Sequence, residues 1–335
     1  MPAIPTPDEL LDAAHVVTLP MRVRFRGVTE REVVLLRGPA GWAEWAPFPE
    51  YADADAARWL AAAVELGWGD VPPPVRPDVG VNATVPAVAA AQVEGVLARF
   101  DGCRTAKVKV AEPGQSLADD VARVVEVRRL MGPGARVRVD ANGAWTVTEA
   151  VTALTALDRS DLEYAEQPCA SVEELGALRV ALARAGVDVP VAADESIRRA
   201  EDPLRVAREN AADLVVVKVA PLGGVARALE VVEACGLPAV VSSALDTSVC
   251  LAAGVRLAAA LPTLEHDCGL GTAALLAADV VADPLLPRAG RLTVDRADAA
   301  RDAVDPARLA AYRTGAERET WWRDRLSRAA ARLRD

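Results

Sequence analysis

The residues that could do chemistry lie between positions 107 and 218, where lysines and carboxylates follow one another at a regular spacing. Three acids stand at or just past the ends of short apolar runs, at Asp140, Glu166 and Asp194. Lysines come before and after them, at Lys107, Lys109 and Lys218. Successive steps are roughly 24 to 31 residues, about the length of one strand–helix unit in a barrel of eight such units.

These residue types suit a metal-assisted proton transfer. Carboxylate oxygens are the hard ligands that Mg²⁺ or Mn²⁺ prefers, and three of them close together would repel one another without a divalent cation. A lysine that is partly desolvated beside a cation has its ammonium form disfavoured, so it can act as a base near neutral pH. The metal would stabilise the negative charge that develops when a carboxylate loses its alpha proton.

Parallel strands repeated at this step would place all of these side chains on one rim. The C-terminal ends of barrel strands share that rim, and the active sites of barrels lie there. Each group also has a purely structural explanation. An acid after a strand can cap the next helix, and a Lys-x-Lys strand can lie at a solvated edge of a sheet. Glutamate is a poor cap, however, separate cap candidates follow at Thr146 and Ser171, and a closed barrel has no edge.

Five short motifs in this order carry a resemblance to a known family. They are Lys107-Val108-Lys109, Asp140-Ala141-Asn142, Glu166-Gln167-Pro168, Asp194-Glu195-Ser196 and Lys218. The set resembles the muconate-lactonizing-enzyme subgroup of the enolase superfamily. Within it, residues 25–32, 242–248 and 267–272 are most similar to the actinobacterial type of o-succinylbenzoate synthases.

The resemblance implies a Mg²⁺-dependent hydro-lyase, with Mn²⁺ as a substitute. Its reaction is syn-dehydration of 2-succinyl-6-hydroxy-2,4-cyclohexadiene-1-carboxylate to 2-succinylbenzoate in menaquinone biosynthesis, through a metal-stabilised enediolate. Asp140, Glu166 and Asp194 are then the metal ligands. Lys109 removes the alpha proton and protonates the departing hydroxyl. Lys218 stabilises the anion from the other face, and Lys107 orients the carboxylate or tunes its neighbour.

Substrate-binding candidates lie on loops of the same rim. They are Asn142, Ser242, Ser243, Arg26 and Gly269. By the resemblance, Arg26 lies in a mobile loop that closes over the barrel mouth, although an exposed basic hairpin is an alternative. Asn142 either orients a ligand or forms a simple turn. The helix start at Gly223-Gly224, the two serines and the Gly269 loop could together hold a second substrate carboxylate.

The predicted fold is α/β, a modified TIM barrel of type (β/α)7β with an α+β capping domain. We expect the cap at 1–78, from strands near 16–20, 21–25, 32–37 and 41–46 and a helix at 53–66. The barrel is expected at 79–285, with its first strand at 79–83, its first helix at 86–100 and its eighth strand near 263–266. Residues 286–335 should pack back on the cap or barrel, with one helical stretch at 306–333.

Composition limits the partners. The formal net charge is −10 with acids and bases interspersed, which argues against nucleic acid and anionic membranes as partners. The expected partner is the small-molecule carboxylate that the site chemistry and the resemblance imply. Five scattered cysteines have no paired spacing and indicate reduced thiols in the cytoplasm. No apolar run reaches membrane-spanning length. The sequence leaves open whether the protein is a monomer or a homo-oligomer.

Other functions fit parts of the pattern. An N-acylamino acid racemase or dipeptide epimerase uses two opposed lysines as acid and base, and a muconate-type cycloisomerase is a further relative. A non-catalytic metal-binding barrel is the alternative from another class. His15 and His266 have no partners at metal or nucleophile spacing, so no Ser-His-Asp set is expected.

Overall fold

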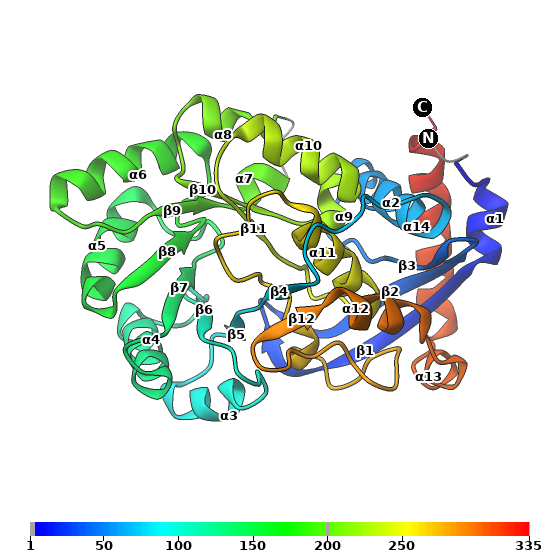
Figure 1. Ribbon diagram of the computed structural model, residues 1–335, viewed down its shortest axis with the longest axis horizontal. Helices are drawn as coiled ribbons and strands as arrows, with labels where there is room; N and C mark the ends of the chain where they lie inside the picture. Colours follow the sequence, from blue (N-terminus) through cyan, green and yellow to red (C-terminus); the bar gives the residue numbers. More distant parts are fainter. Residues whose placement is uncertain (1–3, 199–201, 335) are drawn as a thin grey trace.

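A curved parallel sheet and a smaller antiparallel sheet lie side by side in the computed structural model, which describes residues 4–198 and 202–334 (Figure 1). The parallel sheet has seven strands in the order β11-β10-β9-β8-β7-β6-β5, and its pairings are parallel throughout. Its strands are β5 (Ala83–Val85), β6 (Thr105–Lys109), β7 (Arg136–Asp140), β8 (Leu162–Glu166), β9 (Val191–Ala193), β10 (Leu214–Val217) and β11 (Ala239–Val241). This order confirms the barrel predicted from the strand–helix period.

Helices connect the strands around the outside of the curved sheet (Figure 1). They are α3 (Val93–Leu97), α4 (Leu117–Met131), α5 (Val147–Leu157), α6 (Val172–Ala185), α7 (Glu195–Arg198), α8 (Arg205–Arg208), α9 (Val219–Leu222), α10 (Val225–Cys235) and α11 (Ser248–Ala260). The capping boxes begin at Thr146 for α5 and Ser171 for α6, as predicted. The helix expected over 86–100 is much shorter: a 3-10 turn, η1 (Ala90–Gln92), precedes α3, which ends at Leu97, while the Val88 carbonyl accepts a hydrogen bond from Arg123.

Two bridging residues, not a strand, close the barrel. Cys268 pairs with Val81 and Gly269 pairs with Ser242, both in parallel, so they join the first strand of the barrel to the last. The eighth strand predicted near 263–266 is therefore misplaced by a few residues. The first strand is also displaced, because β4 (Asp78–Gly80) pairs instead with β12 (Arg291–Thr293). Both errors have the same cause: two or three paired residues are too few to produce an alternating pattern.

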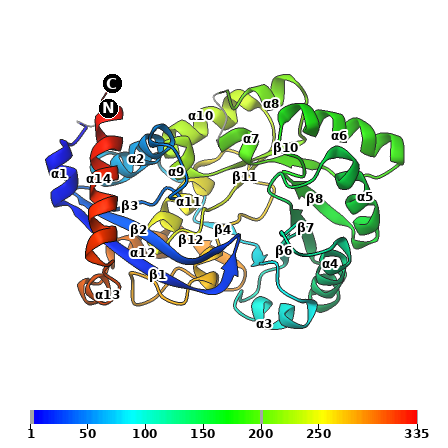
Figure 2. The ribbon, with the colours of Figure 1, turned by 180° about the vertical axis from the view of Figure 1, so that it is seen from behind.

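The cap is a three-stranded meander with helices on it. Its elements are α1 (Pro7–Asp12), β1 (Ala14–Phe25), β2 (Val28–Gly38), β3 (Gly41–Trp45) and α2 (Asp53–Trp68). The two strands expected at 16–20 and 21–25 form the single strand β1, and Pro20 is tolerated because β1 lies at the edge of this sheet. The β1–β2 hairpin turns at Arg26 and Gly27 and reaches toward the barrel strands (Figure 2).

The C-terminal segment returns to the cap, as the fold prediction required. It contains α12 (Val294–Asp302), α13 (Pro306–Ala311) and α14 (Ala316–Arg332). The single helix predicted over 306–333 is interrupted, because residues 312–314 pair with β1: the amide of Thr18 donates to the Tyr312 carbonyl at 2.9 Å and that of Thr314 to the Val16 carbonyl at 3.0 Å. Helix α14 packs its buried Trp322 edge-on against Trp45 of β3, with ring centroids 5.6 Å apart.

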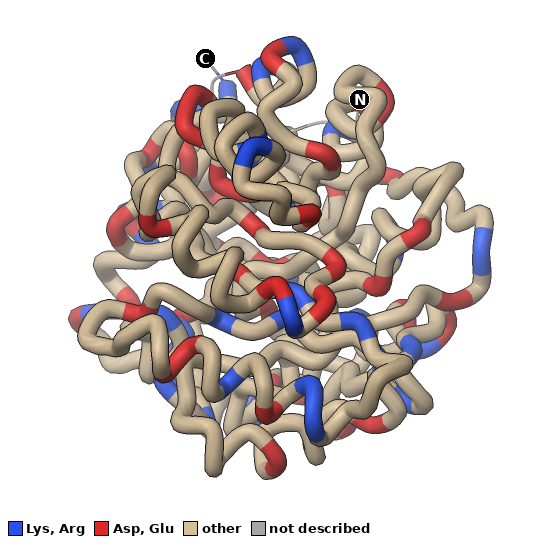
Figure 3. The backbone as a smooth tube through the Cα atoms, turned by 90° about the vertical axis from the view of Figure 1, so that its left-hand side faces the viewer, with Lys and Arg blue, Asp and Glu red and all other residues tan. Residues whose placement is uncertain are grey.

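The division into residues 1–78, 79–285 and 286–335 stays a prediction. No helix in the described part of the chain is long and apolar enough to cross a membrane. Charges of both signs are scattered over the side of the molecule seen in Figure 3.

Buried polar groups join the cap to the barrel. Arg31 of β2 donates to the carbonyl of Leu245, and the hydroxyl and amide of Thr247 donate to Glu44 of β3. Glu44 Oε1 and Asp246 Oδ1 are buried without a hydrogen-bond partner. Burial, and next the charge of Asp246, raise the pKa of Glu44 to about 8. A proton held on this pair would therefore supply a missing donor.

The burial of Glu44 between the cap and the barrel predicts that the stability of the protein depends on pH. The folded protein keeps a proton on Glu44 that the unfolded chain releases above its ordinary pKa of 4.5, so the free energy of unfolding should fall as the pH rises from about 4.5 to 8. Glu44→Gln should flatten that fall by on the order of 1–4 kcal/mol. Thermal melts across this pH range measure it, with the exposed Glu30→Gln as the control. An unchanged slope in Glu44→Gln would contradict the prediction.

Candidate active site

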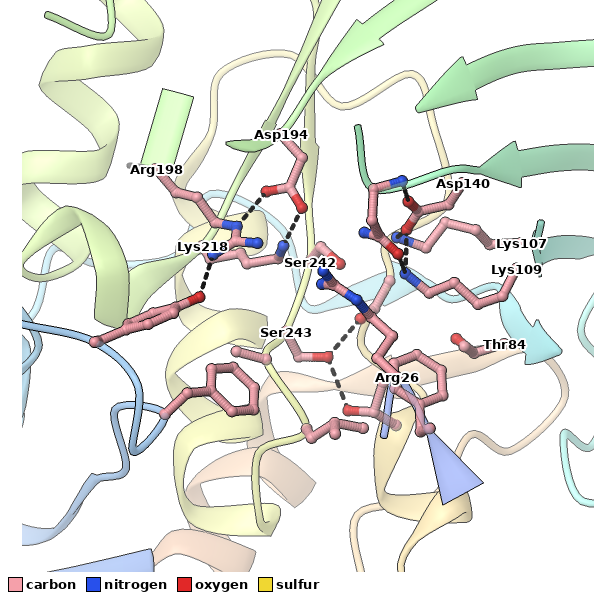
Figure 4. A pocket seen from close by; sticks show the side chains of 18 of the residues that line it. Arg26, Thr84, Lys107, Lys109, Asp140, Asp194, Arg198, Lys218, Ser242 and Ser243 are labelled. Carbon is pink, nitrogen blue, oxygen red and sulfur yellow. Dashed lines mark hydrogen bonds and ion pairs between the residues drawn. The ribbon is translucent and has the colours of Figure 1, made fainter. Parts of the chain in front are cut away.

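A cavity opens at the C-terminal ends of the barrel strands and is covered by cap residues. Every sequence-predicted site residue except Glu166 lines it (Figure 4). The lining residues are Phe25, Arg26, Phe48, Glu50, Tyr51, Thr84, Lys107, Lys109, Asp140, Asn142, Asp194, Arg198, Lys218, Ser242, Ser243, Ala244, Leu245, Gly269 and Thr272. Lys107 and Lys109 enter the cavity from one side and Lys218 from the other (Figure 4). The structure therefore brings the predicted groups together.

Strand register explains why the groups meet. Lys109 at the end of β6 pairs with Asp140 at the end of β7, and Asp140 pairs with Glu166 at the end of β8. Side chains alternate between the two faces of a strand, so Lys107 and Lys109 share the inner face. All of these side chains are nearly inaccessible to solvent: Lys107 and Lys109 are 6% exposed, and Asp140 and Glu166 are 1% exposed.

Lys107 lies between two of the carboxylates. Its Nζ is 2.7 Å from Glu166 Oε1, 2.9 Å from Glu166 Oε2 and 3.3 Å from Asp140 Oδ2. Burial opposes its charge, but the two carboxylates outweigh burial and raise the pKa of Lys107 above its ordinary value. The two carboxylates thus favour the charged form of Lys107, which is the opposite of what a general base requires.

The pKa of Lys109 is shifted in the opposite direction. Its Nζ donates to Asp140 Oδ2 at 2.5 Å and to Asn142 Oδ1 at 2.8 Å. Burial is the largest influence and lowers the pKa of Lys109; the charges of Lys107 and Arg26 act in the same direction, against the attraction of Asp140. The lysine with the depressed pKa is thus the one that the sequence predicted as the base.

Lys218 follows β10 on the other side of the cavity. Its Nζ donates to Asp194 Oδ2 at 2.5 Å, while Arg198 Nε donates to Asp194 Oδ1 at 3.0 Å. Burial raises the pKa of Asp194, but Lys218 and Arg198 outweigh it and lower that pKa to about 2. Asp194 is therefore ionised across the physiological pH range.

The donor set fits a hard divalent cation. Asp140, Glu166 and Asp194 stand at or just after the ends of the neighbouring strands β7, β8 and β9 and offer only carboxylate oxygens. Burial, and next the charge of Asp140, raise the pKa of Glu166 to about 7. Within residues 4–198 and 202–334, no three acidic, histidine or cysteine side chains converge at metal-ligand spacing, and each carboxylate contacts a lysine instead. The three residues thus share one rim, and their role as ligands stays a prediction.

The predicted substrate-binding residues surround the cavity mouth. Arg26 extends from the hairpin tip, 3.6 Å from Glu195, and its side chain is 42% exposed. Asn142 is held by Lys109 and by the carboxylate of Asp140. Ser243 bonds to Gly269 and Thr272, so its hydroxyl is engaged, whereas Ser242 and Gly269 meet so closely that a Cβ at position 269 would lie 2.5 Å from Ser242 Oγ. Their roles with substrate stay predictions.

The proposed anion site at Gly223-Gly224 is wrong. Glu65 of α2 accepts hydrogen bonds from the amides of Val225 and Ala226, so the cap already occupies the N-terminus of α10. A Cβ at Gly224 would lie 2.5 Å from Glu65 Oε2, which explains the glycine there. Glu65 therefore takes the amides of Val225 and Ala226 that the proposed anion site would have used.

Sequence reasoning missed several cavity residues. Phe48 and Tyr51 come from the loop after β3, Thr84 comes from β5 and Arg198 comes from α7. The cap residues had no local signal, because only the packing of the cap on the barrel brings them to the mouth. Arg198 did have a local signal in the sequence. It lies four residues after Asp194, which is the separation that brings side chains together on a helical turn.

Comparison with protein families agrees with this geometry. Residues 88–310 match the family described as enolase C-terminal domain-like, and residues 16–67 match that described as enolase N-terminal domain-like. The chain is 57% identical over 324 residues to an o-succinylbenzoate synthase of Mycolicibacterium smegmatis, across 96% of this chain and 97% of the relative. An o-succinylbenzoate synthase of Mycobacterium tuberculosis is 57% identical over 328 residues, across 97% of this chain and 96% of the relative.

Solved structures show the same fold at low identity. Muconate lactonizing enzyme from Pseudomonas putida superposes with a TM-score of 0.71 at 21% identity, covering 90% of this chain and 98% of the other. The L-Ala-D/L-Glu epimerase from Bacillus subtilis gives a TM-score of 0.69 at 22% identity, covering 84% of this chain and 94% of the other.

Proposed function

This chain belongs to the enolase superfamily, and we propose that it is a lyase with o-succinylbenzoate synthase activity. Its substrate is then 2-succinyl-6-hydroxy-2,4-cyclohexadiene-1-carboxylate, which loses water to form the aromatic ring of 2-succinylbenzoate. The observation that carries the proposal is the similarity to mycobacterial o-succinylbenzoate synthases along almost the whole chain. The site supports it, since a depressed lysine pKa and three buried carboxylates suit removal of a proton beside a carboxylate.

Lys109 acts as the base in this proposal. Its neutral amine takes the proton from the carbon that carries the ring carboxylate, and the electron pair of that C–H bond moves toward the carboxylate. The resulting ammonium then gives the proton to the hydroxyl on the same face, the C–O bond breaks and water leaves. Asn142 and Asp140 hold the lysine by two hydrogen bonds, so the amine is oriented before substrate arrives.

Asp140, Glu166 and Asp194 would hold Mg²⁺, or Mn²⁺ in its place. The bound cation supplies positive charge beside the substrate carboxylate as the proton leaves. Lys107 keeps its charge and orients two of the three carboxylates. This arrangement concentrates positive charge where the reaction creates negative charge.

Lys218 faces Lys109 across the cavity and would stabilise the planar anion from the second face. Arg26, Ser242 and Gly269 line the remaining wall. Arg26 and Ser242 would bind the succinyl carboxylate, because the Gly269 amide already donates to the Val241 carbonyl at 2.8 Å. The proposed reaction is a step in menaquinone biosynthesis. We assign it to the cytoplasm, because all five cysteines are free in the structure.

Product analysis tests the proposal. The protein is incubated with the cyclohexadiene carboxylate and Mg²⁺, and the product is identified by mass spectrometry and proton NMR. We expect complete conversion to 2-succinylbenzoate with the loss of one water per molecule. No conversion by a folded protein that binds Mg²⁺ would keep the superfamily and reject this substrate.

The two opposed lysines favour one second candidate, an N-acylamino acid racemase or dipeptide epimerase. Such an enzyme exchanges the alpha proton of both enantiomers with solvent, whereas the synthase consumes a diene. Incubation of both enantiomers in deuterium oxide, followed by NMR at the alpha position, separates the two. Exchange in both enantiomers without turnover of the diene would replace the synthase by the racemase.

A further inference from the structure

We propose that Arg198 is a positioning residue that fixes the Asp194 carboxylate as a metal ligand and ties it to the cap through Tyr51. The inference rests on the proposed function, because it takes Asp194 as a ligand. It adds that the cap sets the geometry of the metal site before substrate binds. Neither Arg198 nor Tyr51 carries out a chemical step in the reaction proposed above.

The guanidinium group of Arg198 donates hydrogen bonds to three different residues. Nε donates to Asp194 Oδ1 at 3.0 Å, Nη1 donates to the Tyr51 hydroxyl at 2.7 Å and Nη2 donates to Glu195 Oε1 at 2.5 Å. The guanidinium is planar, so its bonds to the Asp194 carboxylate and to the Tyr51 hydroxyl fix these two groups relative to one another. The side chain is 6% exposed, which removes the competition of water for these donors.

The position of the Arg198 guanidinium group is set by the local sequence. Asp194 ends the β9 region, and α7 begins immediately after it, so Arg198 returns over Asp194 after one helical turn. Glu195, on the same turn, balances the charge of Arg198. Glu195 thus offsets part of the charge that Arg198 brings to Asp194, and the proposed role of Arg198 rests on the geometry of its hydrogen bonds.

The cap side of the bond is also rigid. Arg325 of α14 donates to the carbonyls of Phe48 and Tyr51, at 3.1 and 2.6 Å, and so holds the loop from behind. Arg31 stacks over the Phe48 ring, 4.4 Å from its centroid, and Phe48 packs edge-on against Tyr51. A C-terminal helix, a cap loop and a barrel carboxylate are thus joined in one series of contacts.

Charge-conserving variants test the geometry without changing the electrostatics of the site. Arg198→Lys keeps the positive charge but cannot make three divergent bonds, and Tyr51→Phe removes only the hydroxyl. Arg205→Lys on α8 is the matched control, since Arg205 is an exposed arginine paired with Glu173 and Glu209. The probe is Mn²⁺ alone, whose dissociation constant is measured by electron paramagnetic resonance without substrate, after circular dichroism melts confirm folding.

We expect Arg198→Lys to weaken Mn²⁺ binding by about 10- to 100-fold, as is usual for residues that orient metal ligands. Tyr51→Phe should weaken it by roughly 2- to 10-fold, the value of one hydrogen bond. The double variant should bind no more weakly than Arg198→Lys, because Tyr51 acts through Arg198. Arg205→Lys should bind like the wild type.

The outcomes separate this inference from the proposed function. Wild-type affinity in both Arg198→Lys and Tyr51→Phe overturns the inference and leaves the metal site standing. Independent, additive losses in the double variant also overturn it, because Tyr51 would then act by another route. Failure of the wild type itself to bind Mn²⁺ removes the metal site and with it this role for Arg198.

Discussion

Lys109→Ala should lower kcat by at least about 10³-fold, because one general acid–base group contributes roughly 10²–10⁴-fold and Lys109 serves in both proton transfers. Its pKa is lowered by burial in the same cavity that holds Asp140 and Lys107. The truncation also leaves Asp140 without its hydrogen bond from Nζ. Steady-state kinetics on the cyclohexadiene carboxylate measure the loss.

The matched comparison is Mn²⁺ binding by the same variant. Lys109 does not belong to the predicted ligand set, so Lys109→Ala should still bind Mn²⁺ while turnover is lost. If the variant retains wild-type kcat, Lys109 is not the base. Lys218 would then be the group to test next, since it faces the cavity from the other side.

Removal of divalent cations should abolish turnover, and Mg²⁺ should restore it. Asp140, Glu166 and Asp194 are buried in the cavity and would hold the cation, whose positive charge would stabilise the negative charge that develops on the substrate carboxylate. A Lewis acid supplies several kcal/mol to such a transition state, which corresponds to a loss of about 10³-fold or more. Chelation, gel filtration and titration with Mg²⁺ or Mn²⁺ measure the effect on kcat.

A measurement of thermal stability tests the same prediction independently of turnover. A cation that binds only the folded protein raises the melting temperature with concentration. Glu166→Gln should remove both this rise and the activity, while the exposed Glu30→Gln should keep both. Full activity after exhaustive chelation would contradict a role for the cation in catalysis.

The site was predictable because its residues follow a local rule. Each predicted group ends a buried strand or follows its end, and parallel strands share one rim. Asp140 therefore meets Lys109, and Glu166 meets Lys107, without any knowledge of long-range packing. The helix starts at Thr146 and Ser171 are local for the same reason, since a capping box is complete within four residues. A depressed pKa on Lys109 then follows from burial among these groups.

Contacts between distant segments could not be predicted in this way. The barrel is closed by single bridges at Cys268 and Gly269, which leave no periodic pattern. Glu65 reaches the start of α10 from the cap, and Tyr51 reaches Arg198 across more than a hundred residues of sequence. The interruption of the C-terminal helix likewise depends on pairing with β1. Each depends on how the cap packs on the barrel.

The loss of diene absorbance over time tests the central claim most directly. Wild type and Lys109→Ala are followed side by side, first in chelator and then after Mg²⁺ is added. We predict no enzymatic loss in chelator, rapid and complete loss in the wild type once Mg²⁺ is present, and loss at the uncatalysed rate in Lys109→Ala. Equal rates for the two proteins, or a wild type that binds Mg²⁺ and leaves the diene intact, would contradict the account.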